Sequence, residues 1–351
     1  MNAISPSTVL DSLNLGLHQA LADDPQAILL GEDLLDPYGG AFKVTRGLST
    51  AFPDRVLTTP SSEAGITGIA GGMALRGLHP VVEIMFGDFT TLISDQVINH
   101  IAKFNGMYHG AATAPVVIRT PMGGRRGYGP THSQTLEKFF LGVPGLTVLA
   151  PFNLLGELPL GAPGQLLYEA ILNLDAPALF VENKLQYLLK LHTLQDLAEY
   201  SLTSESCTSD IEAPLYALRL TAAPPAEITL AAYGYMAHLA LDAMYRLAYE
   251  HEIFCELLVP TRLAPFELGP LFDSVGHTGR LLTVEEGTFS LGWGAEVLAR
   301  TAEALGAGLK QAARLAACEG VIPVAPDLET SCLPGIDEIV ARVREMVTNH
   351  G

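Results

Sequence analysis

One acid and one histidine stand out because each belongs to a glycine-rich segment suited to holding a ligand. Glu63 is the only charged residue of the segment 59–74, which reads T-P-S-S-E-A-G-I-T-G-I-A-G-G-M-A. His132 lies near the end of the segment 119–134, R-T-P-M-G-G-R-R-G-Y-G-P-T-H-S-Q. An acid that holds a cofactor through a proton, together with a histidine that titrates near neutral pH, is a combination typical of an enzyme.

Glu63 has both a structural and a functional interpretation. The strand-like residues 54–57 lead into a predicted helix, and an acid in the first turn stabilises the helix dipole. Taken alone, this spacing favours the structural interpretation. Four glycines follow in the same predicted helix, where each costs about 1 kcal/mol relative to alanine; they are Gly65, Gly68, Gly71 and Gly72. So many glycines indicate a close approach of another group, which favours the functional interpretation.

His132 also has an ordinary alternative, because an isolated histidine in a loop is usually a hydrogen-bonded surface residue. Its loop, however, contains four glycines between two predicted strands, namely Gly123, Gly124, Gly127 and Gly129. We expect such a loop to be mobile enough to close over a substrate and present the imidazole to it. Arg125 and Arg126 in this loop either attract an anionic substrate or form a solvated basic turn.

Met85, Phe86 and Phe89 lie at the end of a predicted strand, where aromatic side chains either enter the core or offer a flat surface to a heteroaromatic ligand. Phosphate-binding motifs are weak by comparison. The pattern G-x-x-x-x-G-K-[ST] does not occur in the sequence, and no dinucleotide fingerprint follows a predicted strand. The glycine-rich segment 287–294 fits a packing turn better than a phosphate nest.

The composition is typical of a large globular protein. The 351 residues are 48% hydrophobic and 17% charged, which allows two cores and buried subunit contacts. A formal net charge of −18 opposes binding to nucleic acid and to anionic membranes. The four cysteines form no C-x-x-C pair, which indicates reduced structural thiols. With neither a signal peptide nor a membrane-spanning run in the sequence, we expect a cytoplasmic protein.

Short apolar runs alternate with longer amphipathic ones, a pattern typical of an α/β fold with parallel strands joined by helices. The expected strands are 27–33, 80–86, 114–120, 146–151 and 178–182 in the first half, and 227–234, 254–260 and 279–287 in the second. A polar, proline-rich stretch separates the two series. We therefore predict a larger domain over 1–200, a linker over 201–226 and a smaller α/β domain over 227–351.

An ordered series of motifs covers nearly the whole chain. The first half contains G-E-D at 31–33, G-G-A-F-K-V-T-R-G-L at 39–48, T-P-S-S-E-A-G-I at 59–66, S-D-Q-V-I-N at 94–99, I-R-T-P at 118–121, T-H-S-Q at 131–134 and P-G-L-T-V-L-A-P at 144–151. The second half contains V-P-T-R-L-A-P at 259–265, G-R-L-L-T-V-E-E at 279–286, I-P-V-A-P at 322–326 and L-P-G at 333–335. In this order the motifs resemble the β subunit of the thiamine-diphosphate-dependent E1 component of 2-oxo acid dehydrogenases, in the transketolase superfamily.

The resemblance implies a pyrimidine-binding domain followed by a transketolase C-terminal-like domain. Glu63 resembles the acid that hydrogen-bonds N1′ of the aminopyrimidine and promotes its imino tautomer, which takes the proton from the thiazolium C2. Phe89 matches the aromatic residue that packs on the pyrimidine, and Met85 and the backbone near Ser61 match further contacts around that ring. Glu32 matches an acid near Glu63, with which it shares a proton or a water.

For His132 the resemblance implies the histidine that faces the substrate and stabilises the developing intermediate. It also implies an α subunit that binds the diphosphate through Mg²⁺, because the family's G-D-G signature for that ion does not occur here and Gly87-Asp88-Phe89 matches it only in part. The usual assembly of the family is an α2β2 heterotetramer. The substrate would be a 2-oxo acid, and the acyl group would pass to a lipoyl carrier, E2.

Three segments depart from the family pattern. Relatives often hold a monovalent cation through an aspartate in the segment matching 172–177, where this chain has Leu174 followed by Asp175. The loop 125–130 and the segment 85–89 differ from pyruvate-type versions, which indicates a specialised substrate, as in a biosynthetic pathway. Two alternatives stay open: a two-subunit transketolase-like carboligase that passes the intermediate to an aldehyde, and a non-catalytic structural subunit. The presence of both Glu63 and His132 argues against the second.

Overall fold

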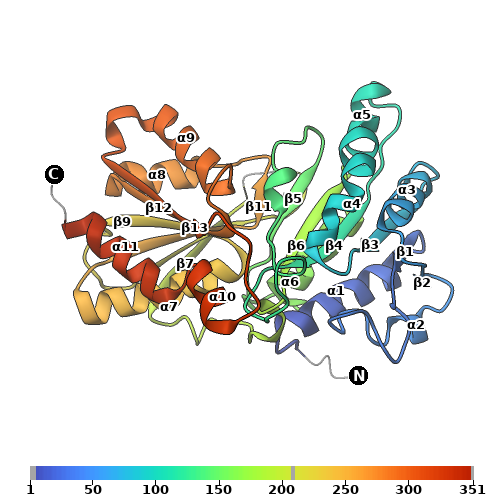
Figure 1. Cartoon of the computed structure of the whole chain (residues 1–351), viewed down its shortest axis with the longest axis horizontal. Helices are drawn as coiled ribbons and strands as arrows, with labels where there is room; N and C mark the ends of the chain where they lie inside the picture. The colour runs from blue at the N-terminus through green and yellow to red at the C-terminus, as the bar shows by residue number, and fades with distance from the viewer. Residues whose placement is uncertain (1–4, 207–209, 349–351) are drawn as a thin grey trace.

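A computed structural model of the protein describes residues 5–206 and 210–348. Cys207, one of the four cysteines expected to be reduced thiols, lies outside the described residues. The chain forms two α/β halves that lie side by side, each built on a mostly parallel sheet with helices packed against it (Figure 1). The predicted α/β class with two sheets is therefore confirmed.

The first half contains a seven-stranded sheet in the order β11-β5-β6-β4-β3-β1-β2. Its strands are β1 (Ala27–Gly31), β2 (Val56–Thr58), β3 (His79–Glu83), β4 (Val117–Met122), β5 (Thr147–Leu149), β6 (Ala178–Asn183) and β11 (Arg262–Ala264). All neighbours pair in parallel except β11, which pairs antiparallel with β5. The carboxyl ends of the central strands therefore lie at one edge of the sheet.

The described residues of this half also form helices, two of which are in close contact. The helices are α1 (Val9–Asp23), α2 (Leu48–Ala51), α3 (Glu63–Ala74), α4 (Thr90–Asp95), α5 (Phe104–Met107) and α6 (Gly161–Leu172). Thr8 and Asp11 form a capping box at the start of α1. A Cβ atom on Gly16 would lie 2.4 Å from the carbonyl oxygen of Gly164, so α1 and α6 approach as closely as glycine allows.

The second half contains a six-stranded sheet in the order β13-β12-β9-β10-β8-β7. Its strands are β7 (Tyr200–Glu205), β8 (Leu215–Leu220), β9 (Ile228–Ala232), β10 (Cys255–Pro260), β12 (Arg280–Thr288) and β13 (Gln311–Ala317). Its helices are α7 (Gly234–His251), α8 (Gly269–Thr278), α9 (Trp293–Leu305), α10 (Pro326–Cys332) and α11 (Ile336–Thr348). Short 3₁₀ or π turns occupy Gly87–Phe89, Gln96–His100, Ile101–Lys103, Glu137–Phe139, Gln186–Leu188 and Gly306–Gly308. Among the described residues, no helix combines the length and apolar character needed to cross a bilayer.

Each of the eight expected strands overlaps an observed one, but the expected linker over 201–226 differs from the structure. It contains most of β7 and the whole of β8, which extend the second sheet as antiparallel strands. Serine, threonine and proline in this stretch suggested a linker. The apolar residues of Leu215–Leu220, which pair with β10, were the overlooked strand signal.

The two halves form one continuous packing unit. Strand β11 comes from the second half of the sequence and completes the sheet of the first half, in the middle of the molecule (Figure 1). One apolar cluster joins strand residues of the first half, such as Ile118 and Val148, to Leu263, Leu281 and Trp293 of the second. A large shared core of this kind opposes independent motion of the halves.

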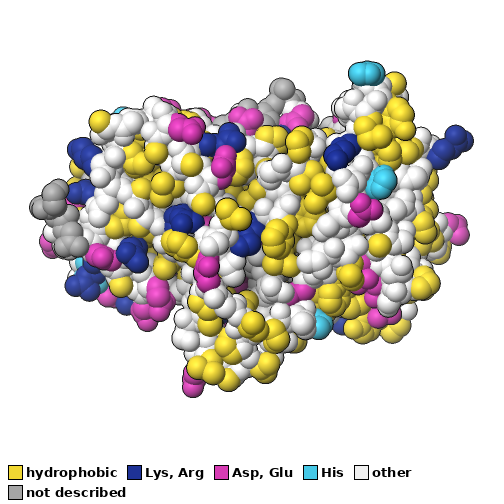
Figure 2. Space-filling model, turned by 45° about the horizontal axis from the view of Figure 1, so that its top comes forward, with side chains coloured by type: hydrophobic (Ala, Val, Ile, Leu, Met, Phe, Trp, Pro, Cys, Tyr) yellow, Lys and Arg dark blue, Asp and Glu magenta, His cyan; other side chains and the backbone are white. Residues whose placement is uncertain are grey.

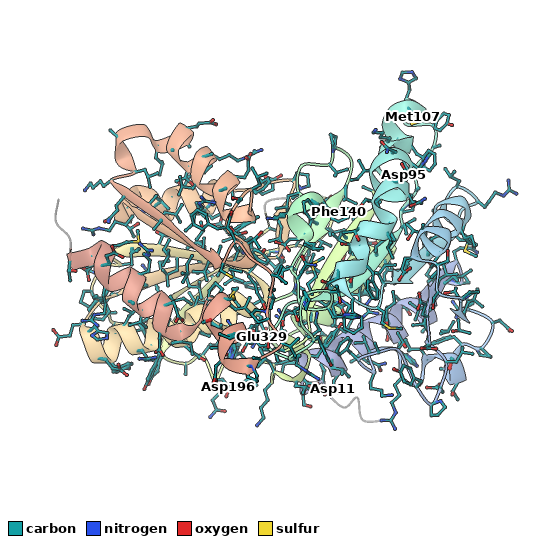
Figure 3. The ribbon with its side chains drawn as sticks, in the orientation of Figure 1. Asp11, Asp95, Met107, Phe140, Asp196 and Glu329 are labelled. Atoms are coloured by element: carbon teal, nitrogen blue, oxygen red, sulfur yellow. The ribbon has the colours of Figure 1, made fainter. Side chains whose placement is uncertain are left out.

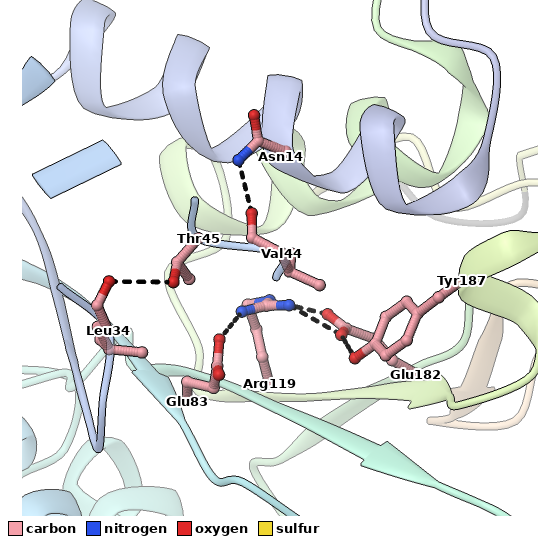
Figure 4. Close-up of polar contacts among 8 residues, drawn as sticks. All are labelled: Asn14, Leu34, Val44, Thr45, Glu83, Arg119, Glu182 and Tyr187. Carbon is pink, nitrogen blue, oxygen red and sulfur yellow. Dashed lines mark hydrogen bonds and ion pairs between the residues drawn. The ribbon is translucent and has the colours of Figure 1, made fainter. Parts of the chain in front are cut away.

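A buried ion cluster joins three neighbouring strands of this sheet, β3, β4 and β6 (Figure 4). Arg119 of β4 donates two hydrogen bonds of 2.8 Å to the carboxylate of Glu182 in β6 and one of 2.7 Å to Glu83 in β3. Tyr187 donates a further hydrogen bond of 2.5 Å to Glu182. Removal of one partner of such a buried ion pair costs about 3–5 kcal/mol, because the charge of the other partner stays buried without compensation.

The described cysteines are free thiols, as the sequence predicted. Cys255 is buried, and this burial raises the pKa of its thiol well above the usual value. Cys318 and Cys332 lie next to each other, and the N–H of Cys318 donates a 2.8 Å hydrogen bond to the carbonyl of Cys332.

Candidate active site

The residues selected from the sequence come from one edge of the first sheet. Strands β2, β1, β3 and β4 are neighbours, and their ends are in register through the pairs Gly31–Thr58, Gly31–Glu83 and Glu83–Arg119. The segments that leave this edge carry Glu32 after β1, Ser61 and Glu63 after β2, Met85 and Phe89 after β3, and His132 after β4. In open α/β sheets, ligands bind outside the carboxyl ends of the strands. All six selected residues therefore start from the edge where a ligand is expected.

Glu63 is the first residue of α3, so the predicted first-turn acid is confirmed. Its side chain is half-buried. Ser61, two residues earlier, donates a 2.9 Å hydrogen bond to Oε2 of Glu32. Glu32 was expected to share a proton or a water with Glu63, whereas the structure pairs it with the hydroxyl of Ser61. Two acids and a hydroxyl thus occupy one end of the sheet edge.

The glycines of α3 have two different environments. Gly71 is buried, and a Cβ atom there would lie 3.1 Å from the side chain of Ile101, so this glycine permits close packing within the protein. Gly65, Gly68 and Gly72 are exposed. Ile69, between them, is 58% exposed. The close approach predicted from the sequence is therefore present at Gly71, while the other glycines leave an open apolar face.

His132 packs against an aromatic cluster and is not an ordinary surface histidine. Its ring centroid lies 4.7 Å from that of Phe86 and 5.4 Å from that of Phe89, both in edge-to-face geometry. Phe86 and Phe89 are themselves 5.7 Å apart. The hydroxyl of Thr131 lies 2.9 Å from Nδ1 of the imidazole. Phe89 and His132 are each half-buried, so this cluster offers a partly exposed aromatic surface beside an imidazole.

The loop that carries His132 is fastened by the second half of the molecule. Oε1 of Glu286, in β12, accepts a 2.8 Å hydrogen bond from the N–H of Gly124, and Oε2 accepts one of 2.8 Å from Asn183. Gly123 has a φ of 91°, and a Cβ atom there would lie 2.4 Å from the amide nitrogen of Asn183, so glycine is required. The loop was expected to be mobile, but its first residues are held by a buried carboxylate.

A second carboxylate holds the middle of the same loop. Glu329 of α10 accepts hydrogen bonds of 2.8 Å from the N–H of Arg125 and 3.0 Å from the N–H of Gly127. Figure 3 places Glu329 at the boundary between the two halves. The guanidinium of Arg125 donates to the carbonyl of Pro334. Arg125 is therefore engaged in a structural contact, and Arg126, which is exposed, is the residue of the two that is available to an anion.

The glycine-rich segment 287–294 is a packing turn, as predicted. The N–H of Gly294 donates a 3.0 Å hydrogen bond to the buried carboxyl of Glu285, and a Cβ atom on Gly292 would lie 2.4 Å from the same carboxyl. Burial and the neighbouring carboxyl of Glu137 raise the pKa of Glu285 to about 8. This segment thus surrounds an acid of the protein itself.

Two further positions were considered as ion ligands from the sequence: Asp88, and Asp175 with its neighbour Leu174. Asp88, in the Gly-Asp-Phe sequence that partly matches a magnesium motif, is buried and accepts a 2.8 Å hydrogen bond from Gln134. Leu174 is buried and Asp175 is exposed. Over residues 5–206 and 210–348, no group of three or more His, Cys, Asp or Glu side chains is arranged to hold a metal ion.

Sequence reasoning missed Glu286 and Glu329 as residues that shape the site. Glu286 lies within the motif G-R-L-L-T-V-E-E, and an acid inside an otherwise apolar strand was a signal that it is buried for a reason. Glu329 lies within the short proline-initiated helix α10 and is 3% exposed. Their hydrogen-bond partners lie 162 and 204 residues away in the chain, a separation that no local pattern reveals.

Comparisons with known proteins agree with this arrangement. Residues 6–158 match the family described as "Transketolase, pyrimidine binding domain", and residues 220–339 match "Transketolase, C-terminal domain". The mitochondrial pyruvate dehydrogenase E1 component subunit beta-1 of Arabidopsis thaliana is 35% identical over 335 residues, which cover 95% of this chain and 87% of that protein. The pyruvate dehydrogenase E1 component subunit beta of Leifsonia xyli is also 35% identical, over 95% of this chain and 92% of that protein.

Two further relatives widen the comparison. The beta subunit of the acetoin:2,6-dichlorophenolindophenol oxidoreductase of Cupriavidus necator is 31% identical over 344 residues, which cover 95% of each chain. A solved structure titled "Split gene transketolase, inactive beta4 tetramer" superposes with a TM-score of 0.70 and covers 97% of this chain and 98% of that chain. Its sequence identity is 17%, so this likeness concerns the fold alone.

Proposed function

The chain belongs to the family of β subunits of thiamine-diphosphate-dependent E1 components, and we propose that Glu63 and His132 carry its part of the reaction. The enzyme is a heteromeric 2-oxo acid dehydrogenase of the E1 type, of which this chain is the β subunit. One observation carries the proposal: Glu63 begins α3 at the same sheet edge from which Phe89 and His132 extend.

The chemistry of this edge fits an aminopyrimidine ring. A half-buried carboxyl at Glu63 can hydrogen-bond a ring nitrogen, and the half-buried ring of Phe89 supplies the flat apolar surface that such a heterocycle requires. Met85, also half-buried after β3, adds a polarisable contact, and the hydrogen bond from Ser61 keeps Glu32 beside this position. Bound thiamine diphosphate supplies the nucleophilic carbon and the electron sink for decarboxylation.

Two residues of the chain move or hold protons in this proposal. Glu63 holds a proton on N1′ of the pyrimidine, and this contact sets the tautomer of the ring. His132 hydrogen-bonds the oxygen of the reacting 2-oxo group or donates a proton to it. Edge-to-face contacts with Phe86 and Phe89 restrict the orientation of the imidazole plane. Arg126, exposed on the same loop, is placed to attract the substrate carboxylate.

A separate α subunit completes the proposed site. In this division of labour it supplies the ligands of the diphosphate and Mg²⁺, the assembly is an α2β2 heterotetramer, and a lipoyl carrier takes the acyl group. The exposed face of α3 around Ile69 supports a subunit contact, since an apolar helix face with three exposed glycines allows a second backbone to approach closely.

Other apolar side chains also reach the surface of this half. Leu92, Met107 and Tyr108 are each at least half exposed, and Figure 2 shows apolar side chains gathered on the projecting end of this half. Figure 3 places Met107 at the tip of α5. Exposed apolar groups of this size are expected where another subunit packs.

A second candidate function keeps the same site but changes the substrate and the acceptor. Two relatives, from Cupriavidus necator and Bacillus subtilis, carry the name acetoin:2,6-dichlorophenolindophenol oxidoreductase subunit beta and are 31% and 32% identical to this chain. Acetoin is an acyloin, so the bond made or broken in the substrate would join two carbonyl-derived carbons, in place of the bond to a carboxylate. The two candidates differ in the accepted substrate and in whether CO2 is released.

Reconstitution tests the proposal. The chain is produced together with an E1-type α subunit from the same organism, and the purified complex is screened with a panel of 2-oxo acids and acyloins in the presence of thiamine diphosphate and Mg²⁺. We expect CO2 release from a 2-oxo acid and loss of at least a hundredfold of this activity in Glu63→Gln. The matched control is Glu338→Gln, which removes an exposed first-turn acid from another helix, α11. Equal turnover of Glu63→Gln and wild type would refute the role of Glu63.

A further inference from the structure

Lys184 is a charged residue that is completely buried beside the candidate site. It directly follows β6, and its relative exposure is 0%. Lysine is almost never fully buried unless its ammonium group has partners. Nζ of Lys184 donates a 2.9 Å hydrogen bond to the carbonyl oxygen of His132. The side chain therefore reaches from the sheet edge to the backbone of the proposed catalytic histidine.

Lys184 also contacts the aromatic cluster that holds the imidazole. Its Nζ lies 5.3 Å from the ring centroid of Phe86, a distance typical of a cation–π contact. Of the four ring contacts of Phe86, the one with His132 is the shortest, with centroids 4.7 Å apart; the others are with Phe42, Phe89 and Tyr128. A single ammonium group thus supports both the backbone of His132 and the ring against which its imidazole packs.

We propose that Lys184 is the positioning residue of His132: its buried ammonium fixes the end of the loop 123–134 and, through Phe86, the orientation of the imidazole. This inference rests on the proposed role of His132. Lys184 is fully buried, so it acts on the substrate only through His132. Glu286 and Glu329 hold Gly124, Arg125 and Gly127 near the start of the loop. At its end, Gln134 is held by Asp88, whereas Lys184 donates directly to the carbonyl of His132.

The protonation state of Lys184 should make its hydrogen bond to His132 depend on pH. Burial lowers the pKa of Lys184 to about 8, although the carboxylates of Asp88, Glu286 and Glu329 favour its charged form; the Arg126 guanidinium adds to the lowering. As the pH rises through about 8, the charge-assisted hydrogen bond to His132 becomes a neutral and weaker one. In the unfolded chain the lysine keeps its proton up to a pKa of about 10.4, so between these two values its contribution to folding stability rises with pH. Activity and stability therefore change in opposite directions.

Two variants separate positioning from packing. Lys184→Met keeps the length of the side chain but cannot donate a hydrogen bond, and Lys184→Gln donates a neutral hydrogen bond at every pH. Lys190→Met, which changes an exposed lysine on the same connection, is the matched control. Hydrogen exchange is measured on the full-length chain without cofactor. We expect Lys184→Met to lose at least fivefold protection at the amides of 129–134, with unchanged exchange in β1, β3 and α11.

Turnover of the reconstituted enzyme supplies the second measurement. At pH 7 we expect Lys184→Gln to turn over about fivefold more slowly than wild type, because a neutral hydrogen bond is about half as strong as a charge-assisted one. The ratio of the two rates should approach one as the pH rises to 9.5. A ratio that stays constant over this range, or unchanged exchange at 129–134 in Lys184→Met, would overturn the proposal. If instead Glu63→Gln proves fully active, the proposed function fails, while the exchange result still decides whether Lys184 holds His132.

Discussion

The two sides of the candidate site are built in different ways. Glu63 stands on a helix whose surrounding face, with Ile69 and three exposed glycines, is open. His132 stands on a loop held by Glu286 and Glu329 from the second half of the molecule and by Lys184, which directly follows β6. The acid side is therefore left for an outside group to complete, whereas the histidine side is completed by the chain itself.

This difference suits an active site that is shared between two subunits. A carboxyl that contacts a cofactor must stay accessible until the cofactor binds, and an open helix face beside it suits a subunit boundary. A histidine that meets a reacting oxygen must already be oriented, because catalytic groups contribute most when their geometry is fixed in advance. Substitutions on the two sides should consequently affect different quantities: cofactor affinity on the acid side and turnover on the histidine side.

The largest effect on the histidine side is expected from His132→Ala. Removing the imidazole takes away a hydrogen-bond partner or proton donor of the reacting oxygen, which is typically worth a hundredfold or more in rate. Cofactor affinity should stay within about twofold of wild type, because the acid side is unchanged. Turnover and the thiamine diphosphate dissociation constant of the reconstituted complex check this. A rate equal to that of wild type would place His132 outside the chemistry.

Glu329→Gln should have a smaller effect of the same kind. A neutral amide accepts the N–H groups of Arg125 and Gly127 less strongly than a carboxylate, and the loss of about 1–2 kcal/mol corresponds to roughly tenfold lower turnover. Asp327→Asn, an exposed acid on the same helix, is the control. A larger change in cofactor affinity than in turnover would contradict the assignment of Glu329 to the histidine side.

Ser61→Ala tests the acid side with a modest expected effect. Loss of the 2.9 Å hydrogen bond to Glu32 should weaken thiamine diphosphate binding about threefold, because an exposed hydrogen bond contributes roughly 0.5–1 kcal/mol. Turnover at saturating cofactor should stay near that of wild type. Isothermal titration of the assembled complex measures this, and a change in turnover without any change in affinity would contradict the assignment.

Glu285→Gln should have the smallest effect on turnover but a clear effect on stability. The carboxyl of Glu285 has a pKa of about 8 in the folded protein and near 4.3 in an unfolded chain. Its contribution to stability is full below the unfolded value and is lost as the pH rises through about 8. Glutamine does not ionise, so the variant does not lose stability in this way as the pH rises. The free energy of unfolding of the variant relative to wild type should therefore increase between pH 5 and pH 8, by an amount on the order of a few kcal/mol. Urea unfolding at both pH values checks the direction. A stability difference that does not change with pH would show that Glu285 is ionised in the folded protein.

The fold could be predicted largely from the sequence, whereas the long-range hydrogen bonds that hold the loop 123–134 could not. Apolar runs such as 80–86 and 178–182 signal buried strands locally, so the strands and their order along the chain were accessible. Strand β11 has only three residues and pairs with β5 across the boundary of the two halves, a pairing that depends on the complete fold. The expected linker 201–226 was misjudged because polar edge strands resemble loops in composition.

The same distinction applies to the site. Glu63 and His132 were found because each lies in an unusual local sequence, and the structure brings their segments to one sheet edge. Lys184 has no local signal, since a lysine after a strand is ordinarily solvated. Its role depends on the burial of its ammonium under Phe86 and on a contact with a residue 52 positions away.

The most direct test of the account is the rate at which the C2 proton of bound thiamine diphosphate exchanges with deuterium, measured by quenched-flow NMR on the reconstituted complex. With wild-type protein we expect exchange faster than turnover. In Glu63→Gln, with the cofactor fully bound, we expect exchange slowed by at least a hundredfold, while Glu338→Gln matches wild type. Rapid exchange in Glu63→Gln would contradict the claim that this carboxyl activates the cofactor.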